Sequence, residues 1–486
     1  MIRVSHRAYS NPEVLMPNYF IAALALLFAV SATAADKPNV LFIAVDDLNH
    51  WVHYLGRNAQ SATPNIDKLA ARGVRFSRSY CAAPVCNPSR AALMSGLRPG
   101  TTGVYENNND WRTVLPEEQM LTSAFRKGGY VALGAGKIYH ESFARKSEWD
   151  DYLAKSVRNP TPEPGQSDGV GGIKFAPLDC KDEALDDWEI TNYGIDQLGK
   201  THDKPMFLTI GLHKPHMPWF VPKKYYDLFP LDKIELPPHS EHDLDDIPAE
   251  GVNMAKPQGD HAAMVASGRW KEAVQGYLAA CAYTDMNIGR LMEAFDKSAY
   301  KDNTIIVFWG DHGWHLGEKE HWRKFTLWEE AARAPLIWIA PGLTKPNSLC
   351  ERTVDFMSIY PTLVDLCALP TPARPLEGTS IKALLANPAA PWDKPAMTTY
   401  LFGNHGIRSE GWRYIHYKNG GEELYNEAVD PYEWKNLADD DKYAAIKSEL
   451  AKQLPASNLP DIGGKKGTDE EGGRKKKGKG KNKKAQ

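Results

Sequence analysis

A cysteine, a serine and an arginine stand close together in the run Cys86-Asn87-Pro88-Ser89-Arg90. Proline suits the first turn of a helix because it has no backbone N–H to leave unpaired there, and Gly96 is a natural helix end. We therefore expect Cys86 at the mouth of a short helix, where unpaired N–H groups and the helix dipole favour an anion. Arg90 follows at the fourth position and can lie on the same side. A potential nucleophile beside an anion site and a fixed cation favours transfer of an anionic group; a small buried cysteine near a helix start is the alternative.

Ionisable side chains also follow four apolar runs elsewhere in the chain. The runs are residues 39–45 before Asp46-Asp47, 130–133 before Gly136-Lys137-Ile138-Tyr139-His140, 206–212 before His213-Lys214-Pro215-His216, and 304–309 before Gly310-Asp311-His312-Gly313. Continuous apolar runs of this length are typical of buried parallel strands. Open α/β sheets bind ligands beyond the carboxyl ends of their strands. We therefore expect these groups to converge on one rim of a sheet.

Three of these side chains, Asp46, Asp47 and Asp311, offer the hard oxygen ligands that suit Ca²⁺ or Mg²⁺ rather than Zn²⁺. Adjacent aspartates repel each other unless a cation lies between them. Helix capping and solvation are the alternative for Asp46 and Asp47. Together with the other strand ends, the pattern favours a metal site.

His216 follows Lys214-Pro215 and precedes Met217-Pro218. Flanking prolines restrict the backbone, which suits a general acid that must meet a leaving oxygen. A structural role is the competing interpretation, more for His213 than for His216.

The run around Cys86 carries a family resemblance. Cys-x-Pro-Ser-Arg followed by Ala-Ala-Leu-Met-Ser-Gly-x-x-Pro resembles the signature of type I sulfatases, and the run from Asp311 to Glu318 is similar to the iduronate-2-sulfatase branch, as is His213-Lys214-Pro215-His216. The motifs occur in family order over residues 39–437. In that family a formylglycine-generating enzyme oxidises the cysteine to Cα-formylglycine, whose hydrate attacks sulfur. The resemblance implies the same maturation partner and the same conversion of Cys86.

The resemblance also implies a set of site residues. One Ca²⁺ would be held by Asp46, Asp47, Cys86, Asp311 and His312. The sulfate oxygens would be held by Arg90, Lys137 and Lys324, with His140 on the nucleophile hydroxyl and His216 as the general acid. Trp314 and His315 are candidates for sugar contact, although an aromatic side chain here can equally pack in the core. Asn404, His405 and Arg408 are candidates for the substrate cleft, with plain solvent exposure as the alternative.

The implied activity is hydrolysis of a sulfate ester on a carbohydrate, with a uronic acid 2-O-sulfate suggested by the iduronate branch. Choline sulfate or a unit of an algal polysaccharide remains open. A phosphomonoester or phosphonate hydrolase on the same scaffold, or a non-catalytic binder of sulfated glycans, are the rival interpretations. The sequence matches no nucleic-acid-binding fold.

The implied fold is α/β: an alkaline-phosphatase-like sandwich with a large, mixed, mostly parallel central sheet flanked by helices, plus a small C-terminal antiparallel-sheet subdomain. The length of 486 residues predicts two domains. We assign 36–370 to a catalytic domain and 371–462 to a C-terminal α+β subdomain, with a linker at 371–375. Helices are expected at 276–297, at 353–369 and from about 442 to 454, and short strands at 397–402, 412–417 and 423–425. Residues 158–174 are expected to form a loop.

The two ends of the chain differ in composition from the rest. Residues 1–35 combine Arg3 and Arg7, a short apolar run and small residues ending at Ala35, which is typical of a secretory signal peptide. We expect export to a periplasmic, extracellular or lysosome-like compartment; an uncleaved anchor is the alternative, and no other stretch should span a membrane. Residues 463–486 hold ten basic and three acidic residues, a net charge of +7, and by composition form a disordered tail that either binds polyanions or only aids solubility. In an exported chain, Cys350 and Cys367 are a possible disulfide pair.

Overall fold

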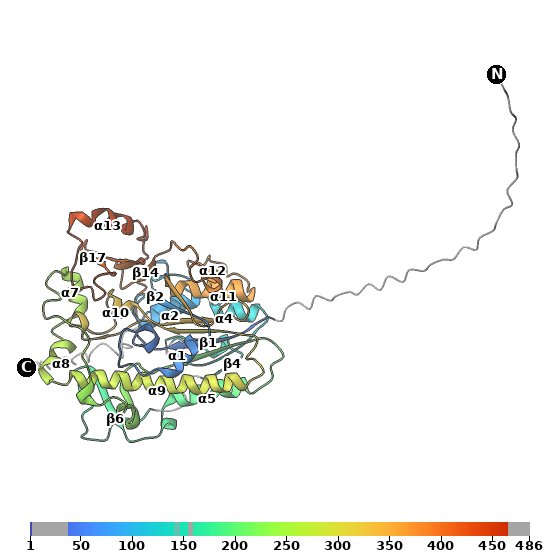
Figure 1. The fold of residues 1–486 in the computed structure, drawn as a ribbon, viewed down its shortest axis with the longest axis horizontal. Helices are drawn as coiled ribbons and strands as arrows, with labels where there is room; N and C mark the ends of the chain where they lie inside the picture. The colour runs from blue at the N-terminus through green and yellow to red at the C-terminus, as the bar shows by residue number, and fades with distance from the viewer. Residues whose placement is uncertain (2–36, 141–142, 144, 154–158, 465–486) are drawn as a thin grey trace, which may run out of the picture. The chain divides into compact units, whose positions relative to one another are not determined.

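The four apolar runs form the centre of an eight-stranded sheet (Figure 1), as predicted. They are β1 (Asn39–Val45), β3 (Val131–Gly136), β7 (Met206–Leu212) and β9 (Thr304–Gly310). Within the sheet they are neighbours in the order β9-β1-β7-β3, and every one of these pairings is parallel. Their carboxyl ends therefore lie at one edge, which is where the ionisable residues follow.

The outer strands make the sheet mixed. The order of the whole sheet is β13-β2-β12-β9-β1-β7-β3-β4. β12 (Leu336–Ile339) runs antiparallel to both β9 and β2 (Val74–Tyr80), whereas β13 (Ser348–Asp355) is parallel to β2 and β4 (Asp151–Leu153) is parallel to β3. This is the mixed, mostly parallel sheet of the expected fold class.

Both faces of the sheet are covered by helices, which explains why β1, β7 and β9 are buried along their whole length. One face packs against α1 (Pro64–Ala70), α5 (Asp186–Leu198) and α9 (Trp270–Lys297). The other packs against α2 (Cys86–Ser95), α4 (Leu121–Lys127) and α11 (Ile359–Cys367), and Figure 1 shows the two groups on opposite sides. Alternate residues of β1 enter the two cores, as the two-residue period of a strand requires.

The helix predicted around Cys86 is α2, and Cys86 is its first residue. Val85 before it is extended, and Gly96 after it takes the left-handed conformation with φ of 71°. All ten residues of α2 are buried. Pro88 and Gly96 therefore predicted the position of this helix correctly. Tertiary packing buries it on every side.

The helix predicted at 353–369 is wrong at its start. Residues 353–355 belong to β13, where Thr353, Val354 and Asp355 pair in register with Arg78, Ser79 and Tyr80 of β2. A 3₁₀ turn, η9 (Phe356–Ser358), then leads into α11. Strand pairing at the sheet edge overrides the local helical spacing. The helix expected at 276–297 is the later part of α9, which starts at Trp270.

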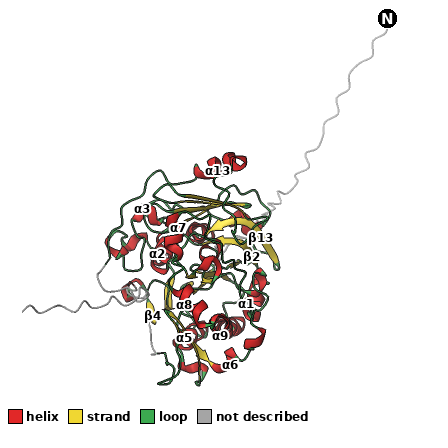
Figure 2. Ribbon diagram, turned by 90° about the vertical axis from the view of Figure 1, so that its left-hand side faces the viewer, coloured by secondary structure: helices red, strands yellow, loops and turns green. Residues whose placement is uncertain are grey.

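The C-terminal subdomain contains a four-stranded antiparallel sheet in the order β14 (Ala396–Thr399), β15 (His405–Arg408), β16 (Trp412–His416) and β17 (Glu422–Asn426). The sequence predicted three of these strands and missed β15. Figure 2 shows α13 (Ala444–Ala451) beyond this sheet, preceded in the chain by η10 (Asp441–Tyr443). Ile415 and Tyr425 of the sheet pack with Leu327 and Trp328 in one apolar cluster, so the subdomain is joined to the main body through its core.

The remaining elements are short or lie at the periphery. β6 (Ile173–Leu178) pairs with β5 (Gly169–Val170) and β8 (Trp219–Pro222), so part of the loop expected at 158–174 is strand. β10 (His315–Leu316) and β11 (Trp322–Arg323) form a small antiparallel pair. The other helices are α3 (Pro99–Thr102), α6 (Lys223–Tyr226), α7 (Ala249–Ala255), α8 (Asp260–Ser267), α10 (Glu329–Ala332) and α12 (Lys382–Ala386), with 3₁₀ turns η1 (His53–Leu55), η2 (Trp111–Thr113), η3 (Glu117–Gln119), η5 (Lys146–Glu148), η6 (Asp182–Ala184), η7 (Leu231–Lys233) and η8 (Glu318–Glu320).

This computed structural model describes Met1 and residues 37–140, 143, 145–153 and 159–464. Residues 2–35 of the predicted signal peptide and residues 465–486 of the predicted tail lie outside the described residues. None of the described helices combines the length and apolar character needed to cross a bilayer. All six cysteines are described and none of them forms a disulfide, so the expected Cys350–Cys367 pair is wrong. The Cys350 thiol instead lies 3.4 Å from the carbonyl oxygen of Pro388. The division at residue 370 stays a prediction.

Candidate active site

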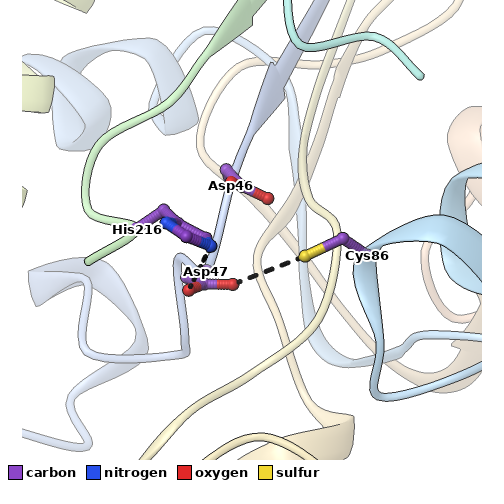
Figure 3. Close-up of side chains that lie close together, drawn as sticks. All are labelled: Asp46, Asp47, Cys86 and His216. Carbon is purple, nitrogen blue, oxygen red and sulfur yellow. Dashed lines mark hydrogen bonds and ion pairs between the residues drawn. The ribbon is translucent and has the colours of Figure 1, made fainter. Parts of the chain in front are cut away.

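The side chains of Asp46, Asp47, Cys86 and His216 point toward one another (Figure 3). Their potential ligand atoms all lie within 4.8 Å of one another, and the same is true of Cys86, Asp311 and His312. The residues come from the end of β1, the start of α2 and the loops after β7 and β9. The structure therefore brings together groups that lie far apart in the sequence, at the rim where the strand ends predict them.

Cys86 is the residue that the two groups share. Its Sγ lies 3.3 Å from Nε2 of His312, 3.4 Å from Nζ of Lys324 and 3.9 Å from Oδ1 of Asp47. Burial and the charge of Asp46 raise the pKa of the Cys86 thiol well above its ordinary value, against the opposing effect of the nearby lysines. In this setting the thiol is protonated at neutral pH and is a weak nucleophile.

Asp47 is held in an unusual backbone conformation with φ of 56°, which aspartate tolerates better than most residues. Its N–H donates to Oδ1 of Asp311 at 3.0 Å, and its carbonyl oxygen accepts the hydroxyl of Tyr277 at 2.9 Å. The same Tyr277 oxygen accepts the N–H of Asn49 at 2.9 Å. Tyr277 is a positioning residue that the sequence did not reveal, because it is one apolar-face residue among many on α9.

The Asp47 carboxylate has two different environments. Its Oδ1 accepts Nζ of Lys324 at 2.9 Å, whereas its Oδ2 is buried and accepts no hydrogen bond. Burial raises the pKa of Asp47, aided by the charge of Asp46 and opposed by Lys324 and His216. Buried carboxylate oxygens normally accept hydrogen bonds. One that accepts none, with other carboxylates nearby, is expected where a cation binds.

Arg90 is fully buried and joins three segments. Nε donates to Oδ2 of Asp311 at 2.9 Å, and Nη2 donates to Oδ1 of Asp46 at 3.2 Å. Nη1 donates to the carbonyl oxygens of Lys137 and Ile138. In this structure the guanidinium binds carboxylates and backbone oxygens and so positions Asp46 and Asp311. The role at the sulfate oxygens that the family resemblance implies for Arg90 stays a prediction.

The two lysines predicted to bind sulfate each contact a carboxylate in this structure. Nζ of Lys137 lies 2.5 Å from Oδ2 of Asp46, and Nζ of Lys324 lies between Asp47 and Cys86. Burial opposes ionisation of Asp46, but Lys137, His216 and Arg90 outweigh it and hold the pKa of Asp46 well below its ordinary value. Asp46 is therefore an anion at neutral pH.

His216 is the member of the group that faces solvent, with 24% of its side chain exposed against 1% for Asp47. Its Nε2 lies 3.8 Å from Oδ2 of Asp47, and its Nδ1 lies 2.5 Å from the carbonyl oxygen of Met217. The peptide bonds before Pro215 and Pro218 are both cis. The partly open position suits a group that meets the leaving part of a substrate.

His312 and Ser89 complete the wall around Cys86. Nε2 of His312 lies 3.4 Å from Oδ1 of Asp47 and 3.6 Å from Oδ2 of Asp311, while its Nδ1 lies 3.0 Å from the carbonyl oxygen of Gly313. The hydroxyl of Ser89 donates to the backbone oxygen of Asp311 at 2.6 Å. Ser89 therefore fixes the segment that carries Asp311, a role that the motif around Cys86 did not specify.

Two predicted sugar contacts, Trp314 and His315, are placed differently, and one further site residue, His140, is not tested. Trp314 is fully buried against Trp219, which supports the packing alternative. Both ring nitrogens of the buried His315 lie against internal partners, Nδ1 at 3.1 Å from the Glu318 carbonyl and Nε2 at 2.9 Å from the Thr326 hydroxyl. His140 contacts Phe143 with ring centroids 6.3 Å apart, and its role at the nucleophile stays a prediction.

The three cleft candidates in the C-terminal sheet are turned inward. Asn404 donates Nδ2 to the Tyr400 carbonyl at 2.9 Å, His405 lies 3.0 Å from the Thr399 hydroxyl, and Arg408 pairs with Glu329 and Glu427. All three are buried. The alternative of plain solvent exposure is therefore wrong for all three, and their contact with a substrate stays a prediction.

The residues predicted to hold a metal fit a cation. The carboxylates of Asp46, Asp47 and Asp311 lie around Cys86, together with the imidazole of His312. Oδ2 of Asp47 accepts no hydrogen bond. A set dominated by oxygen ligands suits a hard divalent ion.

Comparisons with known proteins show what the chain as a whole resembles. The Sulfatase family model matches residues 38–368, and the model of the N-sulphoglucosamine sulphohydrolase C-terminal region matches residues 317–459. A sulfatase of Formosa agariphila is 38% identical over 448 residues, covering 87% of each chain. Iduronate 2-sulfatase of Mus musculus is 30% identical over 397 residues, covering 70% of this chain and 71% of that protein. The phosphonate monoester hydrolase of Agrobacterium radiobacter has the same fold, with a TM-score of 0.72 at 23% identity over 86% of this chain and 95% of that chain.

Proposed function

This chain belongs to the sulfatase family of sulfate ester hydrolases, and from that premise we propose that it removes sulfate from a sulfated carbohydrate, with a uronic acid 2-O-sulfate as the sugar. The observation that carries the proposal is the convergence of Cys86 with Asp47, His312 and Lys324 in one buried cluster. The sugar is supported by the iduronate 2-sulfatase similarity, which extends over 70% of the chain.

Two groups would complete the pocket. Asp46, Asp47, Asp311 and His312, with the Cys86 position, would hold one Ca²⁺, which supplies positive charge against the oxygens of a sulfate ester when bound. Cα-formylglycine formed from Cys86 would supply a hydrated aldehyde as the nucleophile. The raised pKa of the unmodified thiol is consistent with a need for such a conversion.

The chain's own side chains would divide the remaining work. Lys137 and Lys324, which now contact Asp46 and Asp47, would donate to the sulfate oxygens on which negative charge builds up. Arg90 would keep Asp46 and Asp311 at a fixed separation. His216, at the open side, would give its proton to the departing alcohol oxygen, and His140 would contact the nucleophile.

We also propose that residues 1–35 direct export and that a formylglycine-generating enzyme matures the chain. Both proposals rest on the sequence.

The test is turnover by protein produced together with a formylglycine-generating enzyme. Sulfate release is measured from a disaccharide bearing a 2-O-sulfated uronic acid, from one sulfated on glucosamine, and from 4-nitrophenyl sulfate, with 4-nitrophenyl phosphate as the comparison. Peptide mass establishes whether Cys86 is converted. We expect release from the uronic acid 2-O-sulfate to be fastest.

The matched variants are Cys86→Ala and Cys81→Ala, which truncate two fully buried cysteines five positions apart. Cys86→Ala should lower turnover by about 10³-fold or more while the thermal unfolding midpoint stays near that of the parent, and Cys81→Ala should retain turnover. A Cys86→Ala protein with near-parent rate, or faster release of phosphate than of sulfate, would contradict the proposal.

A further inference from the structure

A second group of potential metal ligands lies at the start of α5. It consists of Asp186, Asp187 and His213, whose ligand atoms lie within 4.8 Å of one another, and it shares no residue with the two groups around Cys86. Asp186 and Asp187 are the first two residues of α5, and His213 directly follows β7. The arrangement therefore joins a helix start to the loop that carries His216.

The two aspartates have different roles. The Asp187 carboxylate holds the loop, because Oδ1 accepts the N–H of His213 at 2.7 Å and Oδ2 accepts the N–H of Lys214 at 2.8 Å. Nδ1 of His213 lies 3.4 Å from Oδ1 of Asp187 and 3.4 Å from Oδ2 of Asp186. These separations are close to those between neighbouring ligands of one ion with bonds of about 2.1 Å.

The Asp186 carboxylate is the feature of this group that indicates a bound cation. It is fully buried, and neither of its carboxylate oxygens accepts a hydrogen bond, not even from the N–H groups at the start of its own helix. Among the described residues, His213 is the one basic side chain within ion-pair distance of it. A buried carboxylate without hydrogen bonds is costly, and its Oδ2 points toward the imidazole nitrogen that would share an ion with it.

We infer that Asp186, Asp187 and His213 form a second cation site, which takes a divalent transition ion. Two carboxylates with one imidazole are a ligand set for Mn²⁺ or Zn²⁺, whereas Ca²⁺ prefers oxygen ligands alone. The ion binds between the first turn of α5 and the loop after β7, so it pins residues 213–216 to the helix. This inference does not depend on the reaction at Cys86.

The test is metal uptake. Chelator-treated protein is saturated with Ca²⁺ to fill the pocket around Cys86 and is then titrated with Mn²⁺, and free Mn²⁺ is measured by its electron paramagnetic resonance signal. Mn²⁺ is preferred over Zn²⁺ as the probe because the chain has six free thiols. We expect one further equivalent to bind.

Asp186→Asn keeps the shape of the side chain and removes its charge, and His213→Gln removes the imidazole. Each should weaken Mn²⁺ binding at least about tenfold. Loss of a residue that only contacts a metal ligand already lowers metal affinity by about that factor. Glu189→Gln is the matched control: it makes the same change of charge in the same first turn of α5, outside the group of ligands, and should bind like the parent.

Thermal unfolding midpoints in chelator establish that each variant is folded, and His213→Gln serves if Asp186→Asn is not. Absence of Mn²⁺ uptake by the Ca²⁺-saturated parent would overturn the inference. Uptake by a folded Asp186→Asn or His213→Gln protein with parent affinity would overturn it as well. Sulfate release is not the readout, so this outcome is separate from that of the proposed function.

Discussion

The backbone N–H of Asp47 donates to the side chain of Asp311 over 3.0 Å, although 264 positions separate the two residues in the chain. This bond joins the ends of β1 and β9, which are paired in parallel up to Val45 and Gly310. The parallel register brings both residues to the same rim, and the left-handed backbone of Asp47 turns its N–H toward the partner carboxylate. Two strand ends thereby become one ligand-bearing wall.

The guanidinium of Arg90 should be needed for its shape as well as its charge. Arg90→Lys keeps the charge but cannot donate to Asp46, Asp311 and two backbone oxygens at once. Loss of this positioning should lower kcat about 10²-fold for any sulfate ester. Arg98→Lys, at an ion pair with Asp355 outside the pocket, is the control and should retain kcat. A parent rate in Arg90→Lys would show that the guanidinium contacts are dispensable.

Removal of divalent ions should inactivate the protein and destabilise it. The three carboxylates around Cys86 favour a bound cation, and an ion present at about 100 times its Kd adds about 2.7 kcal/mol to the free energy of unfolding. Dialysis against a chelator should therefore lower both turnover and the unfolding midpoint, and added Ca²⁺ should restore both. Asp186→Asn should show the same Ca²⁺ response, because Asp186 lies outside this pocket. Full turnover in chelator would count against the metal site.

Replacement of His216 should affect substrates according to their leaving groups. An alcohol needs a proton when it departs, whereas nitrophenolate leaves without one. His216→Gln should therefore lower kcat about 10²–10⁴-fold for an alkyl or sugar sulfate, and much less for 4-nitrophenyl sulfate. Steady-state rates on both substrates test this, with Arg90→Lys as the comparison that slows both. Equal losses on the two substrates would assign His216 a role other than proton donor.

His405 should make the fold sensitive to acid. Burial, with His416 and Arg98 nearby, lowers the pKa of His405 to about 4. The neutral ring fits its partners: Nδ1 lies 3.0 Å from the Thr399 hydroxyl and Nε2 lies 3.1 Å from the Asn458 amide nitrogen, which donates to it. Because the folded pKa lies below the unfolded value of about 6.5, this stability is complete above that pH and is lost between about 6.5 and 4, by up to about 1.4 kcal/mol per unit.

Denaturant unfolding at a series of pH values measures this effect. His405→Gln should show a shallower fall of the free energy of unfolding between pH 6.5 and 4 than the parent. His242→Gln, which changes a side chain that is 82% exposed, should follow the parent curve. Parallel curves for the parent and His405→Gln would contradict the prediction.

The sequence predicted the parts of the fold that depend on local composition. The central strands are long apolar runs and the start of α2 has strong local signals, so their positions and the rim they create followed from the chain alone. β15 was missed because Gly406 and its polar neighbours do not resemble a strand until they pair with β14 and β16. The strand at 353–355 was missed because its partner residues in β2, 78–80, lie 275 positions earlier in the chain.

The directions of side chains in the site were harder to predict than their proximity. The role of Arg90 at the sulfate stays a prediction, but its contacts with Asp46 and Asp311 were not predicted. A buried guanidinium requires carboxylates and carbonyls around it. Trp314 belongs to the same sequence motif as Asp311 and His312, yet its side chain is buried in the core. Successive residues after a strand point in different directions. Tyr277 contacts the site through its hydroxyl, which donates to the carbonyl oxygen of Asp47. No pattern of residue types predicts that contact.

The complete burial of α2 has a consequence for the order of events during biosynthesis. The maturation enzyme that we propose would have to bind the residues around Cys86, and in the folded protein all ten residues of α2 are buried. If Cys86 is converted as proposed, we therefore expect the conversion to precede the folding of α2 into the core. A chain that folds before conversion would keep an unmodified Cys86. The fraction of active protein would then depend on the rate of conversion relative to the rate of folding.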